Sequence, residues 1–262
     1  MNAPATIAPA PRVAPNLAHA FGGIWRLTFR RFLLPGHWLT VGIGLVVLGL
    51  LFAGGPRGRN PGAFLDWTVG FYVTFLVPAL AFMSAAGAIR EEMKGNSVDY
   101  VLTRPVPRPA FVVFKYVAHM VCAQLDFLLA FGLVLGLAAA RNIPDLAMVA
   151  PKLLLGQVLL IAAFSAFGFL CGVLTTRYVV VGLAYAGIIE AGVGQIPTQL
   201  SRLSMTHQVR DLLTSLLGGS QPLTSAPSLL GTSGMLALFC AITLVAAVAL
   251  FTLREFTGAG EA

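Results

Sequence analysis

Two acidic side chains, Asp126 and Glu190, lie well within long stretches that otherwise read as apolar. If these stretches cross a membrane, each charge costs about 2.5–3.5 kcal/mol on insertion scales, so it is seldom idle. Either acid could line a polar pathway or bind a coupling ion. The alternative is a structural hydrogen bond to a neighbouring amide side chain or helix backbone. The sequence leaves both interpretations open.

The largest cluster of charged residues lies between residues 88 and 108, in the run AIREEMKGNSVDYVLTRPVPR. Its glycine and prolines predict two helices with a sharp joint. Gly95 can adopt the left-handed conformation that ends a helix, and residue 96 or 97 can cap a short helix that runs to about Thr103. Pro105 and Pro107 stop that helix.

The short helix predicted here has an apolar face. Val98, Val101 and Leu102 follow the i, i+3, i+4 spacing that places side chains on one side of a helix. Exposed apolar residues on a well-capped helix suit docking into a groove on a soluble partner. An ordinary solvated loop is the alternative.

Other residues that often carry chemistry have no partners at the required spacing. His207 has no neighbour at metal-ligand spacing, so it is predicted to be a surface histidine. The three cysteines lie in apolar stretches without a CxxC pair, which is typical of small core residues. These are Cys122, Cys171 and Cys240. The sequence also contains no G-x-x-x-x-G-K-[ST] phosphate loop, so we expect no ATP hydrolysis by this chain.

The composition is that of a membrane protein. Of 262 residues, 57% are hydrophobic and 10% are charged, and the mean hydropathy is +0.84. A soluble domain carries about 25% charged residues, so most of this surface must face lipid. The net charge of +7 is explained by Lys and Arg in cytoplasmic loops rather than by nucleic-acid binding.

Apolar runs predict an all-α integral membrane protein with six transmembrane helices, each of about 20 residues. The spans lie near residues 38–54, 66–89, 112–140, 152–174, 178–195 and 232–253. Before them, residues 1–16 are predicted to be a disordered cytoplasmic tail. The amphipathic stretch 17–34 is predicted to be an interfacial helix, or otherwise a plain positively charged flank of the first span.

A second amphipathic helix is predicted between the fifth and sixth spans, from Pro197 to Leu217. Because exposed loop backbone cannot lie unsatisfied in hydrocarbon, we expect a partly re-entrant hairpin there. Eleven Lys and Arg residues fall on the side of the N-terminus and six on the other. This bias predicts that both termini are cytoplasmic.

The run from Glu91 to Arg108 resembles the cytoplasmic-loop signature of the ABC-2 type transporter permease family. In that signature a Glu-rich helix end precedes a Gly-Thr or Gly-Ser step, a Leu-Leu-Thr/Ser segment and a Pro-Val-Ser-Arg turn. This chain departs from it with Pro107 in place of Ser and with Asn96 inserted after the glycine. The predicted architecture resembles the family from Leu17 to Leu253.

The resemblance implies that residues 17–262 form a single transmembrane permease domain of an ABC exporter. ATP and Mg would be bound by a separate ATP-binding subunit, present in two copies, and this chain would be non-catalytic, without a cofactor or metal. A second permease chain, identical or different, would complete the pathway in a cell membrane such as the bacterial inner membrane. The residues assigned to coupling with the ATPase are Glu91, Glu92, Gly95, Ser97, Val98, Val101, Leu102 and Arg104.

Two other functions fit parts of the sequence. A membrane enzyme acting on a lipid or isoprenoid phosphate needs clustered polar groups at the membrane face, and Arg90 with Glu91 and Glu92 is the one candidate cluster. A non-transporting membrane relay driven by an ATPase would use the same cytoplasmic loop.

Shortening the apolar face of the predicted coupling helix should weaken binding of the ATP-binding subunit. Truncating Leu102 to Ala removes a contact of about 2–3 kcal/mol, which corresponds to roughly 30- to 150-fold weaker association. Pull-down of the ATP-binding subunit by Leu102→Ala and Val101→Asp chains measures this. Full binding by both variants would show that the segment is a passive loop.

Overall fold

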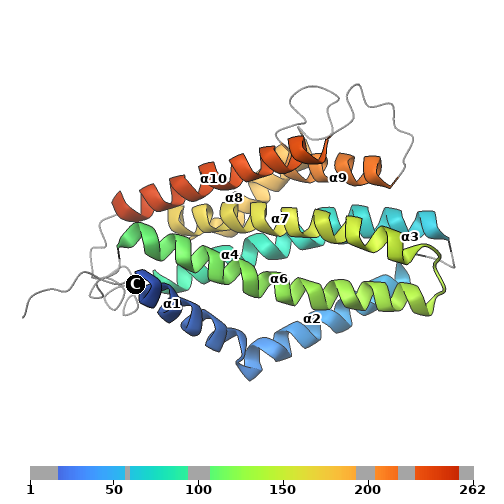
Figure 1. The fold of residues 1–262 in the computed structure, drawn as a ribbon, viewed down its shortest axis with the longest axis horizontal. Helices are drawn as coiled ribbons and strands as arrows, with labels where there is room; N and C mark the ends of the chain where they lie inside the picture. Colours follow the sequence, from blue (N-terminus) through green and yellow to red (C-terminus); the bar gives the residue numbers. More distant parts are fainter. Residues whose placement is uncertain (1–16, 57–59, 94–106, 193–203, 218–227, 254–262) are drawn as a thin grey trace, which may run out of the picture.

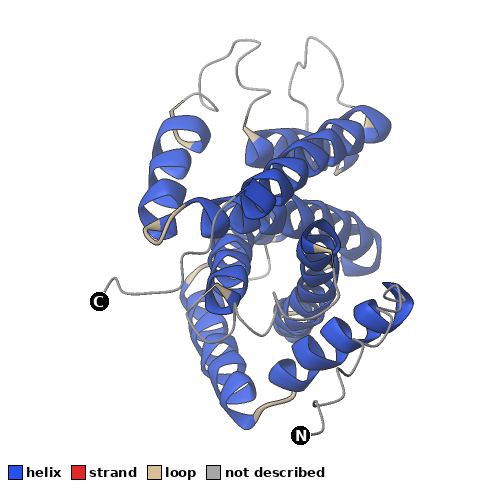
Figure 2. Ribbon diagram, turned by 90° about the vertical axis from the view of Figure 1, so that its left-hand side faces the viewer, coloured by secondary structure: helices blue, strands red, loops and turns tan. Residues whose placement is uncertain are grey.

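The computed structural model describes residues 17–56, 60–93, 107–192, 204–217 and 228–253, and within these ranges all regular structure is helical. Figure 1 shows the helices side by side in one elongated bundle, which Figure 2 views along its length. In chain order the elements are α1 (Leu17–Phe32), α2 (Pro35–Gly54), α3 (Pro61–Trp67), η1 (Thr68–Leu76), α4 (Val77–Glu92), α6 (Arg108–Ala140), α7 (Leu146–Leu174), α8 (Tyr178–Tyr185), η2 (Ala186–Glu190), α9 (Met205–Leu216) and α10 (Leu229–Leu253).

Five of these helices are long and apolar enough to cross a membrane. They are Pro35–Gly54, Pro61–Glu92, Arg108–Ala140, Leu146–Leu174 and Leu229–Leu253. Each overlaps one of the predicted spans, and the shortest has 20 residues, which is about 30 Å of helix and matches a bilayer core. The chain is therefore a multi-pass, all-helical membrane protein.

The predicted fifth span differs from the other five. Its described part, Tyr178–Glu190, is a shorter apolar helix. At 1.5 Å per residue it extends about 20 Å, which is less than a bilayer core. It consists of α8 followed by the π-helical η2. α9 begins beside the last residue of η2: Glu190 accepts a hydrogen bond from the Met205 N–H at 3.2 Å.

The second amphipathic helix is present, with Met205–Leu216 as its described part. Its apolar side is buried against α7 and η1. Its far end is held to the start of α7, since the Lys152 Nζ donates to the Leu216 carbonyl at 2.7 Å. The helix thus lies beside the N-terminal part of α7, at the end of the bundle that also holds α3 (Figure 1).

Local sequence signals explain where several helices start. The Asn60 side chain accepts a hydrogen bond from the Gly62 N–H at 2.9 Å and Pro61 occupies the first turn of α3. Ser204 caps α9 in the same way, by accepting from the His207 N–H at 3.0 Å. Both caps satisfy amide groups that have no partner within the helix.

The crossing Pro61–Glu92 contains a π-helical segment, η1. This segment ends at Leu76, two residues before Pro78. Proline has no N–H, so it cannot supply the next hydrogen bond of a regular helix. The π-helical segment therefore ends where Pro78 interrupts the regular backbone hydrogen bonds of the helix.

Close packing of α4 against α7 forms the centre of the bundle. A Cβ atom on Gly168 would lie 2.6 Å from the Phe82 carbonyl oxygen, and one on Gly172 would lie 2.6 Å from that of Ala86. Small residues at this spacing let helix backbones approach closely in lipid. The similar pair on α6, Gly132 and Gly136, has no atom within 4 Å of the added Cβ positions.

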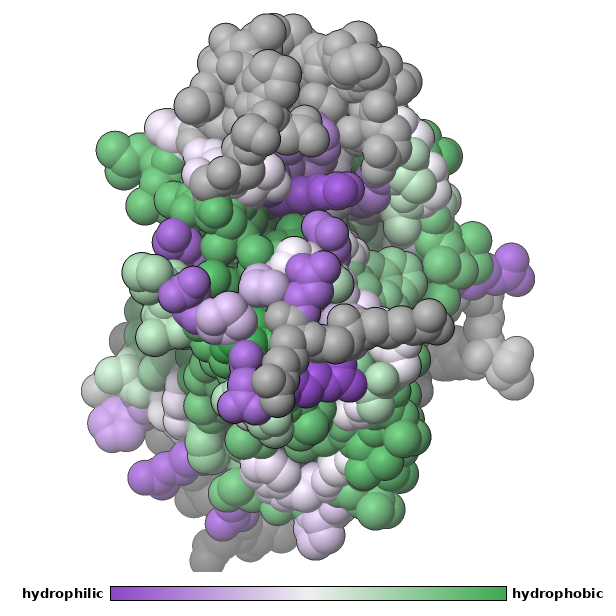
Figure 3. All heavy atoms as spheres, turned by 90° about the vertical axis from the view of Figure 1, so that its right-hand side faces the viewer, coloured by the Kyte–Doolittle hydropathy of each residue, from purple (hydrophilic) through white to green (hydrophobic). Residues whose placement is uncertain are grey.

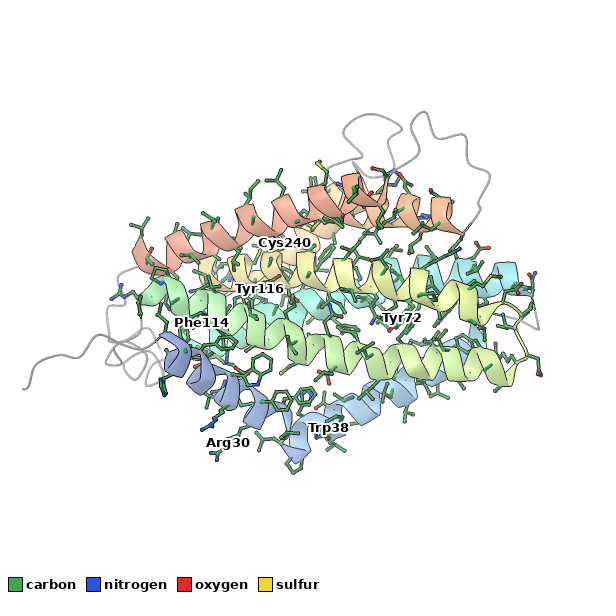
Figure 4. The ribbon with its side chains drawn as sticks, viewed as in Figure 1. Arg30, Trp38, Tyr72, Phe114, Tyr116 and Cys240 are labelled. Atoms are coloured by element: carbon green, nitrogen blue, oxygen red, sulfur yellow. The ribbon has the colours of Figure 1, made fainter. Side chains whose placement is uncertain are left out.

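The helices α1 and α2 diverge from the rest of the bundle. In Figure 1 they meet at a vertex on one side, and α1 runs back towards the end where α4 and α10 finish and α6 begins. The Phe21 and Phe114 rings pack edge to face at 5.2 Å, whereas Arg30 points away from the bundle (Figure 4). This amphipathic arrangement agrees with the predicted helix, whose bounds are Leu17–Phe32.

Only two side chains of α2, those of Leu48 and Phe52, are buried. Its far end is held by Arg141 at the end of α6, whose guanidinium lies 4.7 Å above the Phe52 ring and donates to the Ala53 carbonyl at 3.2 Å. The helix is thus fastened near its ends and loosely packed between them. Figure 3 views this far end of the molecule, where hydrophilic residues gather between hydrophobic flanks.

A larger side chain at Gly172 should destabilise the protein. Gly172→Leu would place atoms against the backbone of α4, and such overpacking costs about 1–3 kcal/mol of unfolding free energy. Gly136→Leu is the matched control, because nothing lies within 4 Å of its Cβ position. Thermal unfolding in detergent micelles measures both. An equal loss of stability in the two variants would contradict the close contact between α4 and α7.

Candidate functional site

A buried ion cluster joins three helices at the end of the bundle where α4 finishes. The Glu92 Oε1 atom lies 2.9 Å from the Lys115 Nζ of α6 and 3.0 Å from a guanidinium nitrogen of Arg31 of α1. The Glu92 and Lys115 side chains are only 6% and 3% exposed. One carboxylate therefore connects the last turn of α4 to α1 and α6.

The neighbouring acid, Glu91, has a different environment. Its side chain is 64% exposed and lies 3.5 Å from Arg31, which is a surface contact that contributes little. The sequence assigns the same coupling role to Glu91 and Glu92, but the structure gives them different surroundings. The other six predicted coupling residues lie outside the described residues: Gly95, Ser97, Val98, Val101, Leu102 and Arg104.

A first cavity, of about 780 Å³, lies between α2, α4 and α6, and we call it the lateral cavity. Its lining includes Arg31, His37, Val41, Gly44, Leu48, Leu80, Met83, Ser84, Lys115, His119 and Asp126. The His37 Nε2 lies 3.1 Å from the Asp126 Oδ1, and the two side chains are 30% and 26% exposed. When Asp126 is ionised its carboxylate only accepts hydrogen bonds, and His37 is then the donor.

A second cavity, of about 660 Å³, lies between α4, α8 and α9, and we call it the η1–η2 groove. Its lining includes Gly70, Thr74, Phe75, Phe82, Phe164, Phe167, Leu183, Tyr185, Gly187, Glu190, Thr206, His207 and Arg210. Both π-helical segments of the described chain contribute to this lining. Such segments are rare in helices and are frequent at functional sites.

Glu190 is saturated with hydrogen bonds where η2 meets α9. Its carboxylate accepts from the Tyr185 hydroxyl at 2.9 Å, from the Met205 N–H at 3.2 Å and from the Thr206 N–H at 3.3 Å. The hydroxyls of Ser204 and Thr206 also donate to it. An acid is favoured there because the start of a helix presents unpaired N–H groups and a positive dipole end. Of the two roles that the sequence leaves open, this geometry favours the structural one.

His207 is half-buried and has a partner. Its Nε2 lies 3.3 Å from the Asp211 Oδ2, one helical turn further on. The i, i+4 spacing of a histidine and an aspartate is a signal by which sequence reasoning could have found this pair.

The two membrane acids, Asp126 and Glu190, do not share a site, because they line different cavities that both border α4. Sequence reasoning missed Lys115 and His37, although Lys115 left a signal. Lys115 falls inside the predicted span 112–140, where a charge needs a partner. Among the described residues, no three His, Cys, Asp or Glu side chains are grouped so that they could hold a metal ion.

Comparison with known proteins adds a family to this geometry. A family model described as ABC-2 family transporter protein matches residues 34–190, which is more than half of the chain. The match extends from the residue before α2 to the end of η2, so it includes the α2, α4 and α6 walls of the lateral cavity and the α4 and α8 walls of the η1–η2 groove, but not α9. No curated protein matches the sequence.

Removing one partner of the buried pair should destabilise the protein strongly. Glu92→Gln leaves the Lys115 charge buried without its carboxylate, which costs about 3–5 kcal/mol of unfolding free energy. Adding Lys115→Met to that variant should restore most of the loss, because neither charge then remains. Thermal unfolding of the purified chain measures both variants.

The adjacent acid supplies the matched control for this measurement. Glu91→Gln should change the unfolding free energy by less than about 1 kcal/mol, as expected for an exposed ion pair. If Glu92→Gln and Glu91→Gln were equally mild, the ion cluster would not be buried as described.

Proposed function

Because this chain belongs to the ABC-2 family of transporter permeases, we propose that it is the membrane subunit of an exporter in which residues 91–104 receive movement from the ATP-binding subunit. The family places an ATP-binding partner beside the membrane subunit. In this proposal two ATP-binding subunits hold ATP and Mg, and the permease chain itself is non-catalytic. The loop that starts after Glu92 is the surface on which one of them docks.

The observation that carries this proposal is the position of Glu92. It is the last residue of α4 and the second of the predicted coupling residues, and it is fixed to both α1 and α6 through Arg31 and Lys115. Buried ion pairs are screened by salt much less than surface pairs, and breaking one is costly. A displacement of the loop would therefore move α4, α1 and α6 together.

Those three helices bound the lateral cavity, and α4 also borders the η1–η2 groove. Movement of the loop would consequently change the shape of both cavities. In this proposal, coupling means that the Glu92 ion cluster connects the cytoplasmic loop to helices that line both cavities.

We place the transport pathway at the η1–η2 groove, against a second permease chain. Arg210 is exposed on α9, and His207 and Thr74 line the same groove. α9 packs against the membrane-spanning helix α7, which supports a position of these polar groups at membrane depth. Lipid tails cannot hydrogen-bond to them, which favours a covering of protein and water.

The proposed topology has six crossings, with both termini in the cytoplasm and the membrane being a bacterial inner membrane. The fifth crossing is discontinuous: α8 and η2 form its inner half and α9 its outer half, with Glu190 at the junction. Transporters use such broken helices where a polar site is needed within the membrane. The course of the chain supports this, because α1 begins and α10 ends at the same end of the bundle (Figure 1).

The proposal predicts that ATP changes the lateral cavity only while the ion cluster is intact. Gly44→Cys places a thiol in that cavity, where the Cβ atom meets nothing within 4 Å. In the purified complex with its ATP-binding subunit, addition of ATP and vanadate should change the rate of thiol labelling at this position at least severalfold. The double variant Glu92→Gln/Lys115→Met should abolish that change while still binding the ATPase.

Glu91→Gln, introduced into the same Gly44→Cys background, is the control and should keep the ATP response. An unaltered response in the Glu92→Gln/Lys115→Met complex would refute transmission through Glu92. Failure of any ATP-binding subunit to co-purify with the wild-type chain would refute the permease proposal itself.

A further inference from the structure

The lateral cavity has the dimensions and walls of a small-molecule site. Its volume of about 780 Å³ lies within the range of roughly 300–1,000 Å³ that is usual for ligand pockets. The apolar part of its lining includes Val41, Leu45 and Leu48 of α2 and Leu76, Leu80 and Met83 on the facing helix. Because α2 is held mainly near its ends and buries few side chains, the cavity borders a loosely packed helix that faces lipid.

Most of the charges around this cavity neutralise one another. Arg31 and Lys115 are cations, and they are paired with the carboxylates of Glu91 and Glu92 at distances of 2.9–3.5 Å. Asp126 also lines the cavity, and among the described residues no Lys or Arg side chain forms an ion pair with its carboxylate.

Asp126 is only partly satisfied within the described structure. Its Oδ1 accepts a hydrogen bond from His37, and no hydrogen bond is formed at its Oδ2 by any of the described residues. Its side chain keeps 26% of its exposure and lines the cavity. An ionised carboxylate that faces an apolar space without a cation is energetically unfavourable. A positively charged ligand would therefore be stabilised beside Asp126.

The chemistry of the lining excludes some occupants and favours one. A metal ion needs several ligands, and the described residues around Asp126 form no group of three His, Cys, Asp or Glu. An anion would be repelled by the same carboxylate. The apolar walls suit the hydrocarbon groups of an organic ion.

We propose that the lateral cavity binds a lipophilic organic monocation, whose charge lies at Asp126 and whose apolar groups pack between α2 and α4. The ligand enters from the lipid, past the loosely packed α2. This site lies apart from the η1–η2 groove, and binding to it requires neither ATP nor a second chain. It can therefore be tested even if the proposed transport pathway is wrong.

Two probe ions of the same shape and opposite charge test the proposal. The full-length chain in lipid nanodiscs should bind tetraphenylphosphonium, measured by equilibrium dialysis above the background of empty nanodiscs. Tetraphenylborate, its anionic counterpart, should show no such protein-dependent binding. Equal protein-dependent binding of the two ions, or none for the cation, would overturn the proposal.

Removing the charge should weaken binding of the cation. Asp126→Asn should raise its dissociation constant at least about tenfold, which corresponds to about 1.4 kcal/mol. Asp66→Asn removes an acid of the same type from an exposed position on α3 that does not line the cavity, and it should leave binding unchanged. If Asp126→Asn bound the cation as tightly as the wild type, the carboxylate would have no role in recognition.

Filling the cavity gives an independent test that does not depend on charge. Gly44 lines the cavity and Gly42 does not, although both lie on α2 and neither would bring an added Cβ within 4 Å of another atom. Gly44→Trp should abolish binding of tetraphenylphosphonium, and Gly42→Trp should preserve it. Retained binding in a folded Gly44→Trp chain would place the cation elsewhere and refute the proposed site.

Discussion

A charge at membrane depth must find its partner within the protein, and here the partners connect helices. Glu92 and Lys115 join α4 to α6, His37 and Asp126 join α2 to α6, and Glu190 joins η2 to α9. Lipid offers nothing that could replace these contacts. Apolar packing holds helices side by side, as α4 and α7 show. The polar contacts add specific attachment points between particular pairs of helices.

The two cavities differ in how their polar groups are satisfied. In the η1–η2 groove the acid is saturated by five donors at a helix start, so its charge is used within the fold. In the lateral cavity the acid has a single hydrogen-bond partner among the described residues, and it lines open space. The first arrangement suits a structural junction in a broken crossing, and the second leaves a negative charge available to a ligand.

The sequence predicted those features that depend on local composition. Long apolar runs predicted the positions of five membrane-spanning helices, and amphipathic patterns predicted α1 and α9. The partners of Lys115 and Asp126 were beyond its reach, because His37 and Asp126 are 89 residues apart and meet only after the helices pack. The role of Glu190 was hidden for the same reason: four of its five donors come from the start of α9, which lies after the predicted span. The loop motif indicated the family, which the match over residues 34–190 shows.

The ion pair between Lys115 and Glu92 lies close to one end of the long helix α6. The helix has 33 residues, so it extends about 50 Å at 1.5 Å per residue, well beyond a bilayer core of about 30 Å. Lys115 lies about 10 Å from its start at Arg108 and about 37 Å from its end at Ala140. If the bond to Glu92 acts as the fulcrum, the two arms differ by a factor of about 3.5. A 1 Å displacement of the short arm would then swing the far end about 3.5 Å the other way.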